Sequence, residues 1–234
     1  MAEWAVELRD VKKTYRLGPI EVPALRGISL RVAPGEFLAI AGSSGCGKTT
    51  LLNIIGGLDR ADTGEVLVEG ENLQLLSASS LARLRLQRLG FVFQAFNLLP
   101  VLTALENAEF TLLLQGVPTK QRRERVEKLF SEIGLSGLES RRPGELSGGQ
   151  QQRVAVARAM VTEPALILAD EPTANLDSTT ATALLDVMEQ LNRTHGTTFV
   201  YATHDPQVMA RAHRLIGLRD GQIATDVAHS SRAP

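Results

Sequence analysis

An eight-residue run, GSSGCGKT at positions 42–49, constrains this chain more than any other feature. It matches the pattern G-x-x-x-x-G-K-[ST] in full, and it lies between an apolar strand-like segment, 37–41, and a helical run, 50–55. In that context the glycines let main-chain N–H groups converge on phosphate oxygens, and the helix N-terminus adds positive potential. Lys48 is then expected to contact the outer phosphates, and the hydroxyl of Thr49 to ligate Mg²⁺. The residues expected to bind the phosphates are Gly42, Ser43, Ser44, Gly45, Cys46, Gly47, Lys48, Thr49 and Thr50.

Two adjacent carboxylates, Asp170 and Glu171, follow a second apolar segment, 165–169. Because successive side chains of a strand point to opposite faces, these two acids cannot have the same role. Asp170 is expected to act on the Mg²⁺ side, largely through water, and Glu171 to accept a proton from an attacking water. An isolated pair of this kind would be a solvated strand end, but the phosphate-binding loop upstream favours a nucleotide-hydrolysing site.

Composition limits the other classes of function. The chain has 234 residues, and its 25 Lys+Arg against 26 Asp+Glu give a net charge of −1. This balance argues against nucleic-acid binding through bulk charge. A single cysteine excludes an internal disulfide framework and a multi-cysteine zinc site. No apolar run approaches the roughly 18 residues of a membrane span, so we expect a soluble chain in the bacterial cytoplasm.

The order of apolar patterns predicts the architecture. Short strands are expected in the first third and alternating strands and helices in the last third, whereas 98–159 has helical spacing. These patterns predict an α/β core with a parallel sheet, an N-terminal antiparallel β-subdomain and an inserted helical subdomain at about 95–160. We expect one domain over residues 1–228 and a flexible tail at 229–234. The strands are placed at 6–11, 25–32, 36–41, 65–69, 90–93, 165–169, 197–203, 215–218 and 223–227, and the clearest helices at 119–133, 178–191 and 207–212.

The pentapeptide LSGGQ at 146–150, followed by QQR, resembles the defining signature of the ATP-binding subunits of ABC transporters. The resemblance covers nearly the whole chain and implies the P-loop NTPase fold of an ABC ATPase. It also implies a second phosphate-binding element at a helix N-terminus. In the family, the signature of one subunit completes the ATP site of the other, so a head-to-tail homodimer is expected in the ATP-bound state. The signature residues expected to contact nucleotide are Ser147, Gly148, Gly149 and Gln150.

The same resemblance implies roles for four further residues. Gln94 matches the glutamine that contacts Mg²⁺ and the attacking water, and His204 matches the histidine that contacts the γ-phosphate. Asp177 matches the D-loop aspartate, although Ala174-Asn175 stands where the family often has serine-alanine. Tyr15 matches the aromatic residue that stacks on adenine, and an ordinary strand-edge tyrosine is the alternative. The implied catalytic set is Lys48, Gln94, Glu171 and His204, and the implied Mg²⁺ set is Thr49, Gln94 and Asp170.

Several longer strings narrow the resemblance to the lipoprotein-release and macrolide-export branch, the LolD-type and MacB-type ATPases. They are NIIGGLD at 53–59, GFVFQAFNLLP at 90–100, LTALEN at 102–107, LADEPT at 168–173 and LRDG at 218–221. The branch implies an ATPase that works an integral-membrane permease by mechanotransmission, from the cytoplasmic face of the inner membrane. Because the chain ends without a membrane segment, it is similar to the free-standing LolD-type arrangement.

Other functions compete with this interpretation. Within the transporters, the alternatives are an exporter of antimicrobial peptides or other heavy molecules and a cell-division ATPase that signals without transport. A soluble ABC ATPase of DNA repair or translation is disfavoured, because only 53 positions separate Gln94 from Ser147 and the charge is near neutral. A nucleotide-binding module without turnover is disfavoured because Glu171 and His204 are both present.

The segment 96–102, FNLLPVL, directly follows Gln94 and is unusually apolar for a connection. Part of it is expected to enter a buried helix. Because it joins Gln94 to the helical insert, it is also expected to contact the permease, through Phe96 and Leu99.

Overall fold

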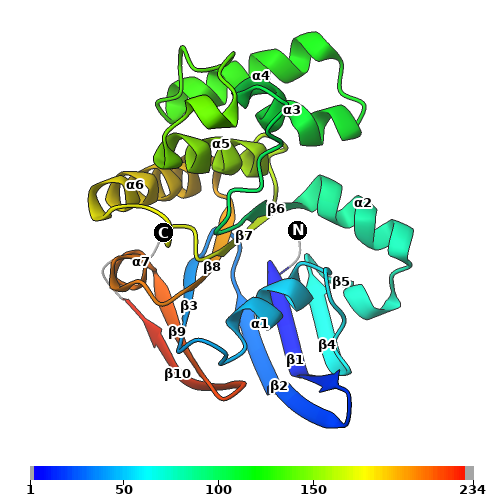
Figure 1. Cartoon of the computed structure of the whole chain (residues 1–234). Helices are drawn as coiled ribbons and strands as arrows, with labels where there is room; N and C mark the ends of the chain where they lie inside the picture. Colours follow the sequence, from blue (N-terminus) through cyan, green and yellow to red (C-terminus); the bar gives the residue numbers. More distant parts are fainter. Residues whose placement is uncertain (1–2, 230–234) are drawn as a thin grey trace.

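The computed structural model describes residues 3–229, without the side chain of Leu17, and this part of the chain forms two sheets (Figure 1). The smaller sheet is antiparallel, in the order β2-β1-β4-β5. Its strands are β1 (Val6–Leu17), β2 (Ile20–Val32), β4 (Thr63–Val68) and β5 (Glu71–Asn72). The larger sheet has the order β10-β9-β3-β8-β7-β6. Its strands are β3 (Phe37–Ala41), β6 (Leu89–Val92), β7 (Leu166–Asp170), β8 (Thr198–Thr203), β9 (Arg214–Arg219) and β10 (Gln222–Ala228).

The larger sheet is parallel from β6 to β9, and only β10 runs antiparallel at its edge. Every residue of β3 and of β8 is buried. Strands covered on both faces read as continuous apolar runs, which is the pattern from which the parallel core is predicted. The expected combination of a parallel core and an N-terminal antiparallel sheet is confirmed.

Three helices form the expected helical insert above the larger sheet (Figure 1). In α4 (Thr119–Glu132), the buried residues Val126, Leu129 and Phe130 lie on one stripe. These side chains join a core cluster that also contains the rings of Phe37 and Tyr201 from the sheet. The helices are α1 (Lys48–Ile55), α2 (Ala78–Arg88), α3 (Ala104–Leu114), α4 (Thr119–Glu132), α5 (Gly148–Met160), α6 (Ser178–His195) and α7 (Pro206–Arg211), with 3-10 turns at Leu73–Leu75 and Pro143–Glu145.

Helix α2 has no counterpart among the elements expected from the sequence. It buries only Leu81 and Leu84, so its apolar stripe is weak. Ser77 caps its N-terminus by accepting the N–H of Ser80 at 3.2 Å. Arg85 also donates to the carbonyl of Gly57 at 2.7 Å. A local cap and a distant contact therefore support a helix that hydrophobic periodicity does not reveal.

Strands β1 and β2 are longer than expected and form an antiparallel hairpin. The antiparallel register pairs Tyr15 with Val22, and shifts in register interrupt the ladder near Val11 and Lys13. These irregularities break the alternation of apolar and polar residues, which explains why the outer halves of both strands escape a pattern search.

At the C-terminal end, the N–H of His229 donates to the carbonyl of His213 at 2.7 Å, so this residue is held against the larger sheet. The rest of the expected tail, 230–234, lies outside the described residues. Within residues 3–229 no helix is both long enough and apolar enough to cross a membrane.

Candidate nucleotide site

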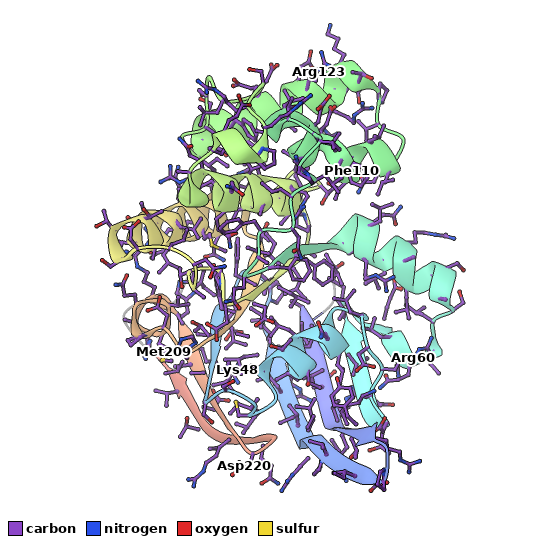
Figure 2. The ribbon with its side chains drawn as sticks, in the orientation of Figure 1. Lys48, Arg60, Phe110, Arg123, Met209 and Asp220 are labelled. Atoms are coloured by element: carbon purple, nitrogen blue, oxygen red, sulfur yellow. The ribbon has the colours of Figure 1, made fainter. Side chains whose placement is uncertain are left out.

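The phosphate-binding loop lies between β3 and α1, as the sequence predicts, and its close packing explains its glycines. Gly47 has φ +108°, and a Cβ there would lie 2.6 Å from the carbonyl oxygen of Ala24. The ammonium of Lys48 is held inside the curl of the loop, where its Nζ donates to the carbonyls of Gly42 at 2.8 Å and Ser43 at 3.2 Å. Figure 2 shows Lys48 in the lower half of the view, between the two sheets.

A cavity of about 750 Å³ opens above this loop. Its volume falls within the range of small-molecule sites. Most of the residues expected to bind nucleotide line it, and four that were not expected join them. The expected ones are Tyr15, Ser43, Ser44, Gly45, Gly47, Lys48, Thr49, Thr50, Gln94, Asp170, Glu171 and His204, and the others are Val22, Pro23, Ala24 and Ala174.

Asp170, the last residue of β7, has the chemistry of a cation ligand. Its Oδ1 is buried and has no hydrogen-bond partner. Burial raises the pKa of this carboxyl above its ordinary value; a hydrogen bond from the Thr49 side chain opposes the rise, and the negative charge of Glu171 adds to it. Mg²⁺ prefers oxygen ligands and one or two carboxylates beside substrate phosphates. A buried carboxylate oxygen next to a threonine hydroxyl therefore fits this ion.

The side chain of Glu171 points in a different direction from that of Asp170, because the backbone turns at Glu171. It has φ +47°, an unfavourable value for a side chain with a Cβ, and its N–H donates to the carbonyl of Ala202 at 2.9 Å. Its Oε1 lies 2.8 Å from Nδ1 of His204. The glutamate side chain is 16% exposed and the histidine 71%. The imidazole thus orients a carboxylate that faces the cavity, and backbone strain at such a position is typical of functional sites.

Gln94 follows β6 and lines the same cavity. Its carbonyl accepts a hydrogen bond from Nδ2 of Asn175 at 2.9 Å. The segment after β6 and the segment that leads to Asp177 are therefore tied together. This bond uses the asparagine at the position where the sequence departs from the usual D-loop pattern.

Tyr15 lies at the other end of the cavity. Its hydroxyl donates to Oδ2 of Asp59 at 2.8 Å, and Nζ of Lys13 lies 5.2 Å from the centre of its ring. Burial raises the pKa of Tyr15, and the hydrogen bond to the Asp59 carboxylate raises it further. The sequence search missed Asp59, because no local pattern links it to a strand 44 positions earlier.

The signature forms the expected helix start but does not line this cavity. Ser147 caps α5, with its Oγ accepting the N–H of Gln150 at 3.3 Å and its N–H donating to Oε1 of Gln150 at 2.9 Å. Asp177 caps α6 in the same way, by accepting the N–H of Thr180 at 3.0 Å. None of the expected residues Ser147, Gly148, Gly149, Gln150 or Asp177 belongs to the cavity wall.

Cys46 and Gly42 are also absent from the wall of the cavity. Cys46 is 5% exposed, and it belongs to the core cluster that contains Leu25 and Leu218. A Cβ on Gly42 would lie 2.5 Å from the Cys46 sulfur. Only the main chain of these two residues is therefore available to a nucleotide, because packing directs the cysteine side chain away from the site.

Comparison with known proteins supports the interpretation of this cavity as a nucleotide site. The profile of the family described as ABC transporter matches residues 25–174, which is more than half of the chain. An uncharacterised ABC transporter ATP-binding protein of Thermotoga maritima is 47% identical over 218 residues, covering 93% of each chain. The macrolide export ATP-binding/permease protein MacB of Syntrophobacter fumaroxidans is 49% identical over 220 residues, covering 93% of this chain and 31% of that protein. The chain thus spans about a third of the length of this MacB relative.

A comparison with solved structures supports the same family. A dimeric, post-hydrolysis structure of the ATP-binding cassette MJ0796 with ADP and Pi superposes with a TM-score of 0.88 at 41% identity, covering 95% of this chain and 98% of that one. The fold and the site define an ATP-binding cassette. The chain belongs to the ABC transporter family, as an ATPase of its MacB-like branch.

Proposed function

We propose that this ATPase drives an integral-membrane permease of the macrolide-export or lipoprotein-release type by mechanotransmission, from the cytoplasmic face of the bacterial inner membrane. MacB proteins of several bacteria support the branch, at 43–49% identity to this chain. The observation that carries the proposal is the shared cavity of Lys48, Asp170, Glu171 and His204. This cavity brings together a lysine that can bind phosphate, a carboxylate that can bind a cation and a carboxylate that can accept a proton.

Each group has a role that follows from its position. Lys48 and the main-chain N–H groups of the loop hold the outer phosphates of ATP. Thr49 and Asp170 would hold Mg²⁺, which when bound would neutralise charge on the phosphates. Glu171 accepts a proton from the attacking water, and His204 keeps the glutamate carboxylate oriented. Gln94, which lines the same cavity, would contact the same water through its side chain.

We propose that two copies pair head to tail when ATP is bound. The signature at the start of α5 is built as an anion-binding helix terminus, yet it lies outside the cavity of its own chain. A second copy that presents its Ser147 and Asp177 to this cavity would use both elements. The solved cassette MJ0796 bound to ADP and Pi is dimeric, which supports the same arrangement.

A second cavity, of about 620 Å³ and mostly apolar, is the proposed docking groove for the permease. Leu58, from the segment after α1, lines it together with Leu86 of α2, Phe91 of β6 and Leu114 of α3. The expected contacts Phe96 and Leu99 are not in its wall, although their neighbour Asn97 is. A short amphipathic permease helix suits such a groove.

Arg158 links this groove to the nucleotide site. It lies at the base of the groove and donates to the carbonyls of Phe96 at 2.9 Å and Asn97 at 2.5 Å. Burial lowers the pKa of its guanidinium. Arg158 belongs to α5, the helix that begins at the signature, and it holds the segment that follows Gln94. A movement of α5 is therefore transmitted to the groove and to the site together.

The groove is tested by Leu114→Asp, in complexes with the membrane permease that co-purifies with the wild-type chain. We expect complex recovery and permease-stimulated ATPase to fall at least tenfold, because a buried unpaired carboxylate opposes docking. Basal ATPase should stay near wild type. Leu75→Asp is the matched control, since Leu75 is 82% exposed and lies outside the groove. Full recovery and stimulation of Leu114→Asp would place the permease elsewhere.

A further inference from the structure

The turn between β9 and β10 is a tight one that lies directly against the phosphate-binding loop. Arg219 pairs with Gln222, so Asp220 and Gly221 alone connect the two strands. Both have positive φ, +49° and +76°. This is the conformation of a two-residue hairpin turn that matches the twist of its strands. Figure 2 labels Asp220 at this turn, and Figure 1 shows the hairpin at the edge of the larger sheet.

Strand β9 places the turn next to the phosphate-binding loop at 42–49. It pairs with β3 in parallel as far as Ala41 opposite Gly217, and it then continues past the end of β3. Its next residue, Leu218, lies beside Gly42, where a Cβ would be only 2.3 Å from the Leu218 carbonyl oxygen. At the turn, the N–H of Gly221 donates to the carbonyl of Cys46 at 3.1 Å. The hairpin thus packs against the first residue of the loop and holds Cys46 through a main-chain hydrogen bond.

Strand β2 closes the arrangement from the other side. The carbonyl of Gly221 accepts the N–H of Arg26 at 2.8 Å. A Cβ on Gly221 would lie 2.7 Å from the carbonyl oxygen of Ala24, and a Cβ on Gly47 would lie 2.6 Å from the same oxygen. The turn, the phosphate-binding loop and β2 therefore meet at the carbonyl oxygen of Ala24, and Ala24 also lines the nucleotide cavity.

We infer that the Asp220–Gly221 turn is a positioning element for ATP binding, and that Gly221 is its critical residue. Phosphate binding needs several N–H groups aimed at one point, and a loop fixed in that conformation before binding loses less entropy on binding. Gly221 supplies an N–H to the loop and a carbonyl to β2, at a spacing that leaves no room for a side chain. This inference rests on the proposed binding of ATP by the loop.

Cys46 gives a direct readout of the loop. It is the single cysteine of the chain, it is 5% exposed, and its carbonyl is the one that Gly221 holds. A buried thiol reacts with a maleimide only when its surroundings open. The alkylation rate of nucleotide-free protein therefore measures how often the loop leaves its closed conformation.

The test compares Gly221→Ala with Gly116→Ala. Gly116 also has φ +76°, but nothing lies within 4 Å of its Cβ position, so the control carries the same backbone strain without the collision. We expect Gly221→Ala to raise the N-ethylmaleimide reaction rate of Cys46 and the Kd for MgATP about tenfold each. The KM for ATP should rise with the Kd, while kcat at saturating ATP changes less than threefold. Gly116→Ala should match wild type in all four quantities.

Local opening is separated from general instability by repeating the alkylation at low urea concentrations. A local opening gives a rate that is almost independent of urea, whereas reaction through global unfolding rises steeply with it. If Gly221→Ala does not fold, Asp220→Gly decides, because added freedom at φ +49° loosens the turn without a collision. We expect a twofold to threefold faster reaction in that variant.

This inference would be overturned if Gly221→Ala left both the alkylation rate of Cys46 and the affinity for MgATP unchanged. If Gly221→Ala does not fold, an unchanged alkylation rate in Asp220→Gly would overturn it. The proposed function would stand if the wild-type protein still binds MgATP. A wild-type protein that binds no MgATP would contradict the proposed function itself, and the inference with it.

Discussion

Replacing Glu171 by glutamine removes one chemical property and little else. The Oε1 of Glu171 lies 2.8 Å from Nδ1 of His204, and an amide oxygen of the same reach can accept the same hydrogen bond. The strained backbone at φ +47° is kept, since the side chain has the same branching. What is lost is the ability to take a proton from water.

The magnitude follows from that loss. General-base catalysis contributes about 10²–10⁴-fold, so kcat should fall by this factor, which corresponds to about 2.7–5.4 kcal/mol in activation free energy. Because the charge of Glu171 is one cause of the raised pKa of Asp170, its removal also favours the ionised form of that ligand. MgATP should therefore bind as well as before, or better.

The assay is phosphate release at saturating MgATP, with the Kd for MgATP and the fraction of dimer by size-exclusion chromatography measured beside it. ATP that is bound but not hydrolysed should increase the dimer fraction. Glu163→Gln is the matched control, because Glu163 also has positive φ, +53°, and does not line the cavity. A kcat of Glu171→Gln within twofold of wild type would refute the assignment.

Three further outcomes follow. Asp170→Asn should raise the unfolding free energy of nucleotide-free protein by about 1 kcal/mol at pH 7. The raised native pKa makes the wild type lose stability as pH rises, so this gain should vanish below about pH 4 in urea titrations. Arg122→Ala should cost about 3 kcal/mol in the same titration, because it leaves Glu109, 8% exposed, without its partner at 3.1 Å; a cost below 1 kcal/mol would contradict this. Tyr15→Ala should weaken MgATP binding about tenfold and Tyr15→Phe less than twofold, if the ring stacks on adenine; equal effects would exclude stacking.

Much of the site could be predicted because its functional residues lie in short contiguous sequence motifs. The loop at 42–49 follows the buried parallel strand β3, Asp170 ends the buried parallel strand β7 and Glu171 follows it, and such strands end at one edge of the sheet. The geometry that joins Glu171 to His204 is less local. It depends on the pairing of β7 with β8, which places Asp170 opposite Ala202.

The rest depends on contacts that no single segment encodes. Val22, Pro23 and Ala24 are ordinary side chains, and they line the cavity because an irregular register brings β2 beside Tyr15. Cys46 lies inside the motif, but its side chain is buried in a hydrophobic core cluster and does not line the cavity. The proposed docking groove likewise gathers residues from α2, β6, α3 and α5, so an apolar run near Phe96 could indicate its neighbourhood but not its wall.

The central claim is that an active site combines the loop of one copy with the signature of another. It is tested by mixing two inactive variants, Lys48→Ala and Ser147→Arg, and measuring ATPase activity. In a head-to-tail pair, one site of each mixed dimer joins the intact loop of one copy to the intact signature of the other. An equal mixture should regain about a quarter of wild-type activity by random assortment. Lys48→Ala mixed with Glu171→Gln should regain none, because both residues belong to the same half of the site. A mixture of the first pair that stays as inactive as its components would contradict the account.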